Sequence, residues 1–264
     1  MWGPEVKLME QSPKRSLPVS IEVGIPLVGA ILLTLTLRTL YPLERVDTGV
    51  LDPAILAGLF LAAQWTYVNH SLVPAAATDR LLGGVLGIAN TLTLLRGALY
   101  AVVAGFIVVP PEPPLVWVPA VAYGSGVVLD KLDGLIARSV GEETPLGARL
   151  DMAFDTFGFV AAPLVAVRWE FLPVWYLLLS AAKYVYRGGL AWRGQRDQPV
   201  YDLPESVIRR YLAGMQMVFL TIALVPVAPR RYVLAVAPFA LAASLLVFAR
   251  DYLVVTGRLS REVT

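Results

Sequence analysis

The 264-residue sequence has no cysteine and one histidine, and only 16% of its residues are charged. Without cysteine it can have no disulfides, thiolate nucleophile or cysteine metal site. Its net charge of +2 and its lack of a long basic run argue against nucleic acid as a partner. By contrast, 57% of the residues are hydrophobic, and the mean hydropathy is +0.65. This composition lies outside the range of soluble globular domains and predicts an all-α integral membrane protein.

A membrane-spanning helix needs about 20 predominantly apolar residues. By this measure the sequence predicts eight spans, at 21–40, 52–69, 84–109, 115–138, 150–168, 171–187, 207–228 and 232–255. Proline marks the connections. Asp52-Pro53 predicts an N-cap followed by the first helical residue, and the proline-rich run 110–114 predicts a short connection that no helix crosses. The first apolar run has no small-x-small cleavage site, so we expect a retained membrane helix.

Lysine and arginine predict the orientation, because these residues are retained on the cytoplasmic side of a membrane. With the N-terminus inside, most of the 22 lysines and arginines fall at inner helix ends and loops. Those that would lie outside are Arg38, Arg45, Arg168, Arg230 and Arg231. We therefore expect a multi-pass protein with both termini in the cytoplasm.

Four aspartates stand out, because carboxylates are costly in hydrocarbon. Asp130 and Asp133 are three residues apart near the cytoplasmic end of one predicted span, and Asp151 and Asp155 are four apart at the start of the next. Each spacing places its pair on one helix face, and the turn-forming residues 141–147 predict that the two helices fold back as an antiparallel pair. The four carboxylates would then converge at one membrane boundary. A divalent cation would relieve their repulsion, and ligands that are all oxygen favour Mg²⁺ or Mn²⁺.

Small and cationic residues are interleaved with these aspartates. Gly134, Ala137 and Gly147 leave room for a ligand, and Arg138 places a cation beside the acidic residues, as a phosphate ligand requires. Any one of the aspartates taken alone would be explained equally well as a helix cap or a solvated interface carboxylate. The combination predicts a site for a phosphate-rich substrate.

The fixed positions of this stretch have the register Asp130-x-x-Asp133-Gly134-x-x-Ala137-Arg138, eight residues, then Gly147-x-x-x-Asp151-x-x-x-Asp155. This register resembles the signature of the CDP-alcohol phosphotransferase family in all eight positions. Upstream, residues 90–96, NTLTLLR, resemble the NxLTxxR stretch on the first helix of that family's core. The resemblance covers about residues 84–256. It implies a six-helix catalytic domain over 81–264, preceded by an extension over 1–80 with two further membrane helices.

The resemblance also implies a reaction. Family members transfer a phosphate-linked group from a CDP-activated alcohol, commonly a lipid, to the hydroxyl of an acceptor and release CMP. By analogy Asp130, Asp133 and Asp151 would be metal ligands, with two ions expected. Asp155 would be the general base and would also contact the second metal ion, while Gly134, Ala137, Arg138 and Gly147 would line the CDP site. The resemblance further suggests a homodimer.

Asn90, Thr93 and Arg96 lie on one flank of an apolar helix. We favour a role for them at the nucleotide or diphosphate. The alternative is that they bond neighbouring helices, with Arg96 pairing with one of the signature aspartates.

Basic residues near the cytoplasmic ends of the sixth and seventh spans are candidates for binding the acceptor. They are Lys183, Arg187, Arg193, Arg196, Arg209 and Arg210. We favour a phosphorylated acceptor, such as glycerol 3-phosphate or inositol phosphate, over serine or another alcohol. Retention of positive charge inside and attraction to anionic lipid would explain most of these residues without any substrate. Two other classes remain open at this point, an ion-coupled transporter and a non-catalytic membrane scaffold.

Overall fold

The structure, a computed structural model, describes residues 28–29, 31–32, 35–36, 39, 52–78, 88–140, 145–203 and 206–259. Most of the predicted span 21–40 lies outside these residues. All regular elements within the described part are helices. The α-helices are α2 (Pro53–Thr78), α3 (Ile88–Gly105), α4 (Val118–Val140), α5 (Pro145–Arg168), α6 (Leu178–Gly194), α7 (Val207–Leu224) and α8 (Arg230–Val255). Three short 3-10 helices also occur, η3 (Phe106–Val108), η4 (Leu115–Trp117) and η5 (Val174–Leu177).

Five helical segments among the described residues are long and apolar enough to cross a membrane. They are Asn90–Val108, Leu115–Leu135, Gly147–Arg168, Val207–Leu224 and Arg230–Val255. The apolar part of α2, Pro53–Val68, is shorter. These segments confirm the predicted all-α, multi-pass membrane fold.

Most helix boundaries follow the proline and capping signals in the sequence. Asp52 caps α2 as predicted, since its Oδ1 accepts a hydrogen bond from the Ala54 amide at 2.7 Å. The predicted start of the sixth span, residue 171, is wrong. Pro173 is extended and is followed by η5, so α6 begins only at Leu178. The 17-residue α6 also carries Lys183 and Arg187, and it is not among the segments long and apolar enough to span a membrane.

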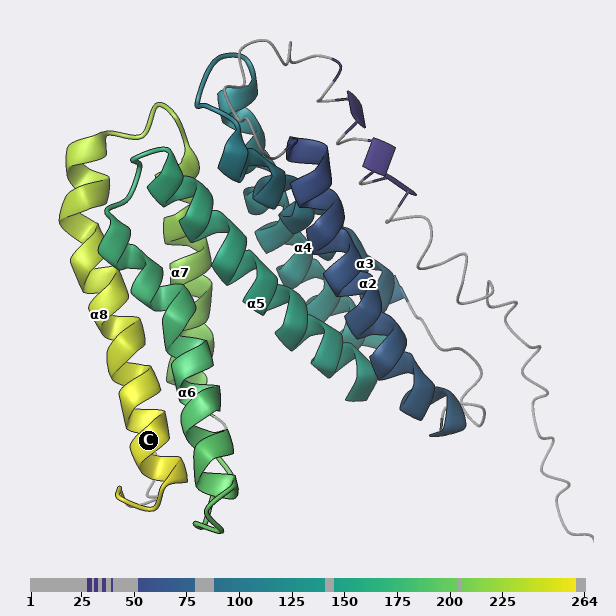
Figure 1. Cartoon of the computed structure of the whole chain (residues 1–264), viewed down its shortest axis with the longest axis vertical. Helices are drawn as coiled ribbons and strands as arrows, with labels where there is room; N and C mark the ends of the chain where they lie inside the picture. The colour runs from purple at the N-terminus through teal and green to yellow at the C-terminus, as the bar shows by residue number, and fades with distance from the viewer. Residues whose placement is uncertain are drawn as a thin grey trace, which may run out of the picture.

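Figure 1 shows α2, α3, α4 and α5 gathered on one side, with α6, α7 and α8 on the other. Helix α3 packs against α2, α4 and α5, whereas α7 contacts α4, α5 and α8, and α6 packs on α8 and α5. The Tyr201 amide donates to the Val255 carbonyl at 2.9 Å, which ties the α6–α7 connection to the end of α8. Both α6 and α8 finish at the same end of the bundle (Figure 1).

Tyr100 of α3 is the centre of the packing between α3, α4 and α5. Its side chain is fully buried, and its ring lies 5.2 Å from the ring of Tyr123, centroid to centroid. A Cβ atom on Gly158 of α5 would stand 2.7 Å from the Tyr100 ring, and one on Gly126 of α4 would also clash with it. The two glycines therefore let α4 and α5 approach the tyrosine closely.

Replacing Gly126 with alanine should lower stability by about 1–3 kcal/mol, because the added methyl group overlaps the buried Tyr100 ring. Thermal unfolding in detergent should show a melting temperature several degrees below that of the wild type. The matched control is Gly188→Ala in α6, where a Cβ meets nothing within 4 Å. Equal melting temperatures for the two variants would contradict this description of the packing.

Candidate active site

The four signature aspartates lie on the two helices expected from their spacing. Asp130 and Asp133 lie on α4, Asp151 and Asp155 lie on α5, and the two helices contact each other. Carboxylate oxygens of Asp130, Asp151 and Asp155 all lie within 4.8 Å of one another. The predicted convergence is thus confirmed for these three residues, which we call the carboxylate cluster.

Asp133 lies beside this cluster and bonds to α3. Its Oδ2 accepts a hydrogen bond from the Thr93 hydroxyl at 2.9 Å, and both side chains are buried. The bond joins the acidic segment of α4 to the NTLTLLR segment of α3, so the two sequence motifs meet in space.

Arg96 carries the positive charge at the centre of the carboxylate cluster. Its side chain is fully buried and forms ion pairs with Asp130, with Asp151 Oδ1 at 2.5 Å and with Asp155 Oδ1 at 3.4 Å. It also donates to the Asp151 main-chain carbonyl at 3.3 Å. The pairing with signature aspartates, which the sequence left as an alternative for Arg96, is therefore present.

The cluster has the donor set of a site for a hard divalent cation. One guanidinium faces three carboxylates, so the negative charge is only partly compensated; Lys131 adds an exposed contact to Asp130 at 2.8 Å. Oδ1 of Asp155 is buried and has no hydrogen-bond partner among the described residues. Carboxylate oxygens are the ligands that Mg²⁺ and Mn²⁺ prefer, so the residues present fit such an ion.

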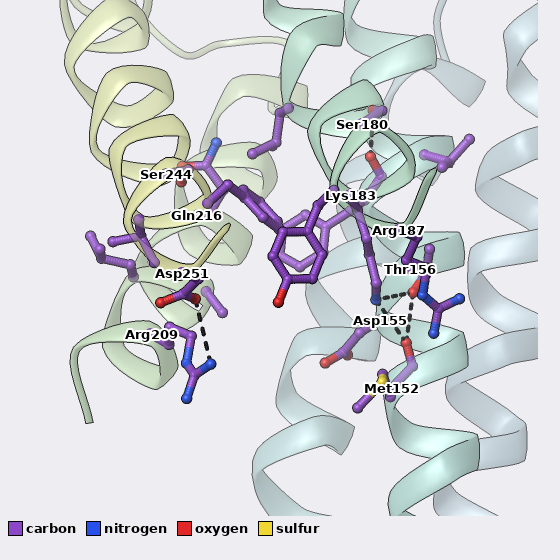
Figure 2. Close-up of a pocket in the computed structure, with 18 of the residues that line it drawn as sticks. Met152, Asp155, Thr156, Ser180, Lys183, Arg187, Arg209, Gln216, Ser244 and Asp251 are labelled. Atoms are coloured by element: carbon purple, nitrogen blue, oxygen red, sulfur yellow. Dashed lines mark hydrogen bonds and ion pairs between the residues drawn. The ribbon is translucent and has the colours of Figure 1, made fainter. Parts of the chain in front are cut away.

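A pocket of about 450 Å³ opens beside Asp155 between α5, α6, α7 and α8. Its charged lining residues are Asp155, Lys183, Arg187, Arg209 and Asp251, and most of its other lining residues are apolar. Figure 2 shows Lys183 beside Asp155 and Thr156, with Asp251 and Arg209 across the pocket. Lys183 bonds the Thr156 hydroxyl and, at 3.3 Å, the Met152 carbonyl.

Three of the six predicted acceptor-binding residues line this pocket, namely Lys183, Arg187 and Arg209. The others are not among its lining residues. Arg193 donates to the Pro199 carbonyl at 3.1 Å, and the Arg196 guanidinium stacks over the Trp192 ring at 4.3 Å. Arg210 is exposed on α7.

The predicted nucleotide contacts are distributed over three helices. Asn90, Thr93 and Arg96 are buried on α3, while Gly134 of α4 and Gly147 of α5 are partly buried. Ala137 and Arg138 belong to α4, but their side chains lie outside the described part of the structure.

Several buried polar residues near the site were not identified from the sequence, among them Gln216 and Ser244 of the pocket, Asp251 and Gln64. Asp251 of α8 is 6% exposed and pairs with Arg209, Nη1 to Oδ2, at 3.4 Å. Gln64 of α2 is 4% exposed and donates to the Gly97 carbonyl at 2.9 Å. A carboxylate or an amide inside a long apolar helix was the signal that could have revealed Asp251, Gln64 and Gln216.

Helix α2 holds α3 and α5 in place around the cluster. The Gln64 Oε1 atom and the Phe154 ring lie 2.9 Å and 3.0 Å from where a Cβ of Gly97 would stand, directly beside Arg96. Farther along α2, the Tyr67 hydroxyl donates to the Arg149 carbonyl at the start of α5, at 3.3 Å. An element before the signature helices therefore contacts both helices that carry Arg96 and Asp151.

These features define a class: a multi-pass helical membrane protein with a carboxylate cluster at a helix pair, next to a pocket lined by cations. The family model described as CDP-alcohol phosphatidyltransferase matches residues 86–256, and the chain belongs to this family. The match contains the carboxylate cluster and the pocket and begins after α2.

Three similar proteins carry the name "Putative cardiolipin synthase", one from Mycobacterium bovis and two from strains of Mycobacterium tuberculosis. Each is 31% identical over 140 residues, which is 52% of this chain. The aligned part spans 66% of the length of each relative. No solved structure shows significant similarity to the chain.

Replacing Gln64 with leucine should lower both stability and turnover, because it removes a buried hydrogen bond beside Arg96. We expect a loss of about 1–3 kcal/mol in stability, measured by thermal unfolding, together with a lower kcat of the transferase activity. Gln198→Leu, in an exposed turn after α6, is the control. Wild-type values for Gln64→Leu would show that α2 does not support the site.

Proposed function

We propose that the protein transfers a phosphatidyl-type group from a CDP-activated lipid to a phosphate-bearing alcohol and releases CMP. The observation that carries this proposal is the position of Asp155, which belongs to the carboxylate cluster and also lines the pocket with Lys183, Arg187 and Arg209. This position supports Asp155 as the residue at which the donor diphosphate and the acceptor hydroxyl meet. Membership of the family supports the reaction class.

In the proposed reaction the acceptor hydroxyl oxygen attacks the phosphorus that bears the lipid. A new oxygen–phosphorus bond forms, the bond from that phosphorus to the bridging oxygen breaks, and CMP leaves with the electron pair. Asp155 accepts the hydroxyl proton as general base. Base catalysis of this kind contributes about 10²–10⁴-fold to the rate.

We propose Asp130, Asp133, Asp151 and Asp155 as ligands for two Mg²⁺ or Mn²⁺ ions. When bound, such ions supply Lewis-acid stabilisation of the charge that develops on the diphosphate. The fit of the carboxylate cluster to a hard cation supports this assignment, as does the uncompensated negative charge around Arg96. The bond from Thr93 to Asp133 orients that carboxylate at the edge of the cluster.

The family resemblance supports Gly134, Ala137, Arg138 and Gly147 as CDP contacts. We propose Asn90 as a further nucleotide contact. Thr93 and Arg96 were predicted to act at the nucleotide or diphosphate. Their observed bonds to carboxylates support an indirect contribution there, in which they hold the ligand side chains in place.

The acceptor pocket supports an acceptor that carries both phosphate and hydrocarbon. Lys183, Arg187 and Arg209 offer cations for the phosphate, whereas Phe159, Val160, Leu179, Leu212, Val247 and Phe248 form an apolar wall. The name of the mycobacterial relatives, "Putative cardiolipin synthase", supports a phospholipid as the product. Glycerol 3-phosphate and inositol phosphate would use the cations but not the apolar wall. Serine or another unphosphorylated alcohol would bring no phosphate to the cations.

The placement in the membrane is also part of the proposal. The excess of lysine and arginine at one set of helix ends and loops supports a cytoplasmic location of both termini and of the active site. On that side CMP can leave into water. We also propose that the protein forms a homodimer, as the family resemblance suggests.

The Asp155→Asn variant tests the proposal, because asparagine keeps the shape of the side chain and removes its basicity. With Mg²⁺, a CDP-lipid and a phosphate-bearing alcohol, we expect release of radiolabelled CMP by the wild type and a loss of at least about 10²-fold in the variant. Asp197→Asn, an exposed position after α6, is the matched control and should retain activity.

Full activity of Asp155→Asn would contradict the assignment of the general base. If the wild type releases no CMP with any acceptor, the transferase proposal itself is wrong, and the transporter and scaffold alternatives return.

A further inference from the structure

The hydroxyl-bearing carbon of Tyr100 lies between α4 and α5, next to the carboxylate cluster. A Cβ atom on Gly126 of α4 would stand 3.0 Å from this carbon, Cζ, and one on Gly158 of α5 would stand 3.1 Å from it. Gly126 comes four residues before Asp130, and Gly158 comes three residues after Asp155. Each glycine therefore lies one turn from a cluster carboxylate on the same helix face, and the Tyr100 hydroxyl belongs to the layer beside the carboxylates.

Polar atoms in this layer are buried and have no hydrogen-bond partner among the described residues. They include the hydroxyl oxygens of Tyr100 and Tyr123 and the Oε1 atom of Gln216, and we call these three residues the polar layer. The two tyrosine rings lie 5.2 Å apart, and both tyrosines are within electrostatic range of Asp155. Oδ1 of Asp155 faces Arg96 at 3.4 Å but accepts no hydrogen bond there. Unpartnered donors and acceptors thus gather on one side of Asp155.

Water is the ligand that suits these groups. A buried polar atom without a partner costs free energy, and a buried water typically makes about three hydrogen bonds to such atoms. The tyrosine hydroxyls can donate to a water, while the Gln216 amide oxygen and the Asp155 carboxylate can only accept from it. Asp155 and Gln216 also line the pocket between α5, α6, α7 and α8 (Figure 2). The polar layer therefore borders a space from which water can enter.

We propose that the polar layer binds ordered water, and that Tyr100 acts through this water as a positioning residue for Asp155. The Tyr100 hydroxyl donates to the water, and the water donates to Oδ1 of Asp155, which holds the carboxylate in its place beside Arg96. Tyr123 and Gln216 supply the remaining hydrogen bonds of the water. The water site rests on burial and geometry, whereas the role of Tyr100 rests on the proposed function, in which Asp155 is the general base.

The sign of a stability change tests the water site. Tyr100→Phe keeps the packed ring and removes one hydrogen bond to the water, so the melting temperature in detergent should fall by about 2–4 °C. A hydroxyl that had no partner would give the opposite sign, because its removal would relieve an unsatisfied buried group. Tyr211→Phe makes the same chemical change at a position of α7 that is 76% exposed, and it should leave the melting temperature unchanged.

A double variant tests whether the two tyrosines share the water. If they do, adding Tyr123→Phe to Tyr100→Phe should lower the melting temperature by less than Tyr123→Phe does alone, because the water is already lost. A rise in melting temperature for either single variant would overturn the water site, and strictly additive losses would overturn its sharing. Tyr123→Phe gives the same test of sign if Tyr100→Phe does not fold.

Steady-state kinetics test the positioning role of Tyr100. In folded Tyr100→Phe we expect kcat for CMP release to fall by about tenfold with KM for the CDP-lipid unchanged, because the hydroxyl acts on Asp155 and not on the substrate. Wild-type kcat in a variant whose melting temperature is lowered would overturn the positioning role. If the wild type releases no CMP with any acceptor, the proposed function is wrong, whereas the sign of the melting-temperature change still decides the water site.

Discussion

The ion pairs of Arg96 are the interaction on which the rest of the structure depends. A fully buried guanidinium holds three carboxylates from α4 and α5 together, and those carboxylates would otherwise repel one another. Removing Arg96 would cost about 3–5 kcal/mol, because the carboxylates that it faces would be left uncompensated. The same arrangement keeps the site negative, since one cation faces three carboxylates. The same charges thus underlie both the stability of the helix packing and the proposed binding of a divalent cation.

Helix α3, which carries Arg96, packs against the helices that surround the carboxylate cluster. Arg96 and Tyr100 lie one turn apart on it and contact α4 and α5, while Gly97 and Gly105 allow α2 to approach. At Gly105 a Cβ would stand 2.9 Å from the Pro53 carbonyl oxygen, so the start of α2 packs directly against the end of α3. The pocket lies on the other side of α5, between helices that share fewer contacts with α3. The fold therefore separates a tightly held carboxylate cluster from the pocket between α5, α6, α7 and α8, and Asp155 belongs to both.

The sequence predicted the helical membrane fold and the convergence of the aspartates, because hydropathy and helical periodicity are local properties. It left the partner of Arg96 open, since the contacts to Asp130 and Asp151 join residues 34 and 55 positions apart. The sequence did not predict the pairing of Arg209 with Asp251 or the bond from Gln64 to Gly97, because these partners are also far apart in the chain. The start of α6 was misplaced because hydropathy did not register the extended Pro173 and the short helix η5. Local patterns thus located the signature aspartates, while long-range packing determined which side chains support them.

We propose that the carboxylate cluster around Arg96 holds a divalent cation. This binding is tested most directly by titrating the purified protein with Mn²⁺ and following the free ion by electron paramagnetic resonance. We predict saturable binding to the wild type that is retained in Asp197→Asn, lost in Asp151→Asn, and competed by Mg²⁺. Equal Mn²⁺ binding by the wild type and Asp151→Asn, or no saturable binding by either, would contradict the claim.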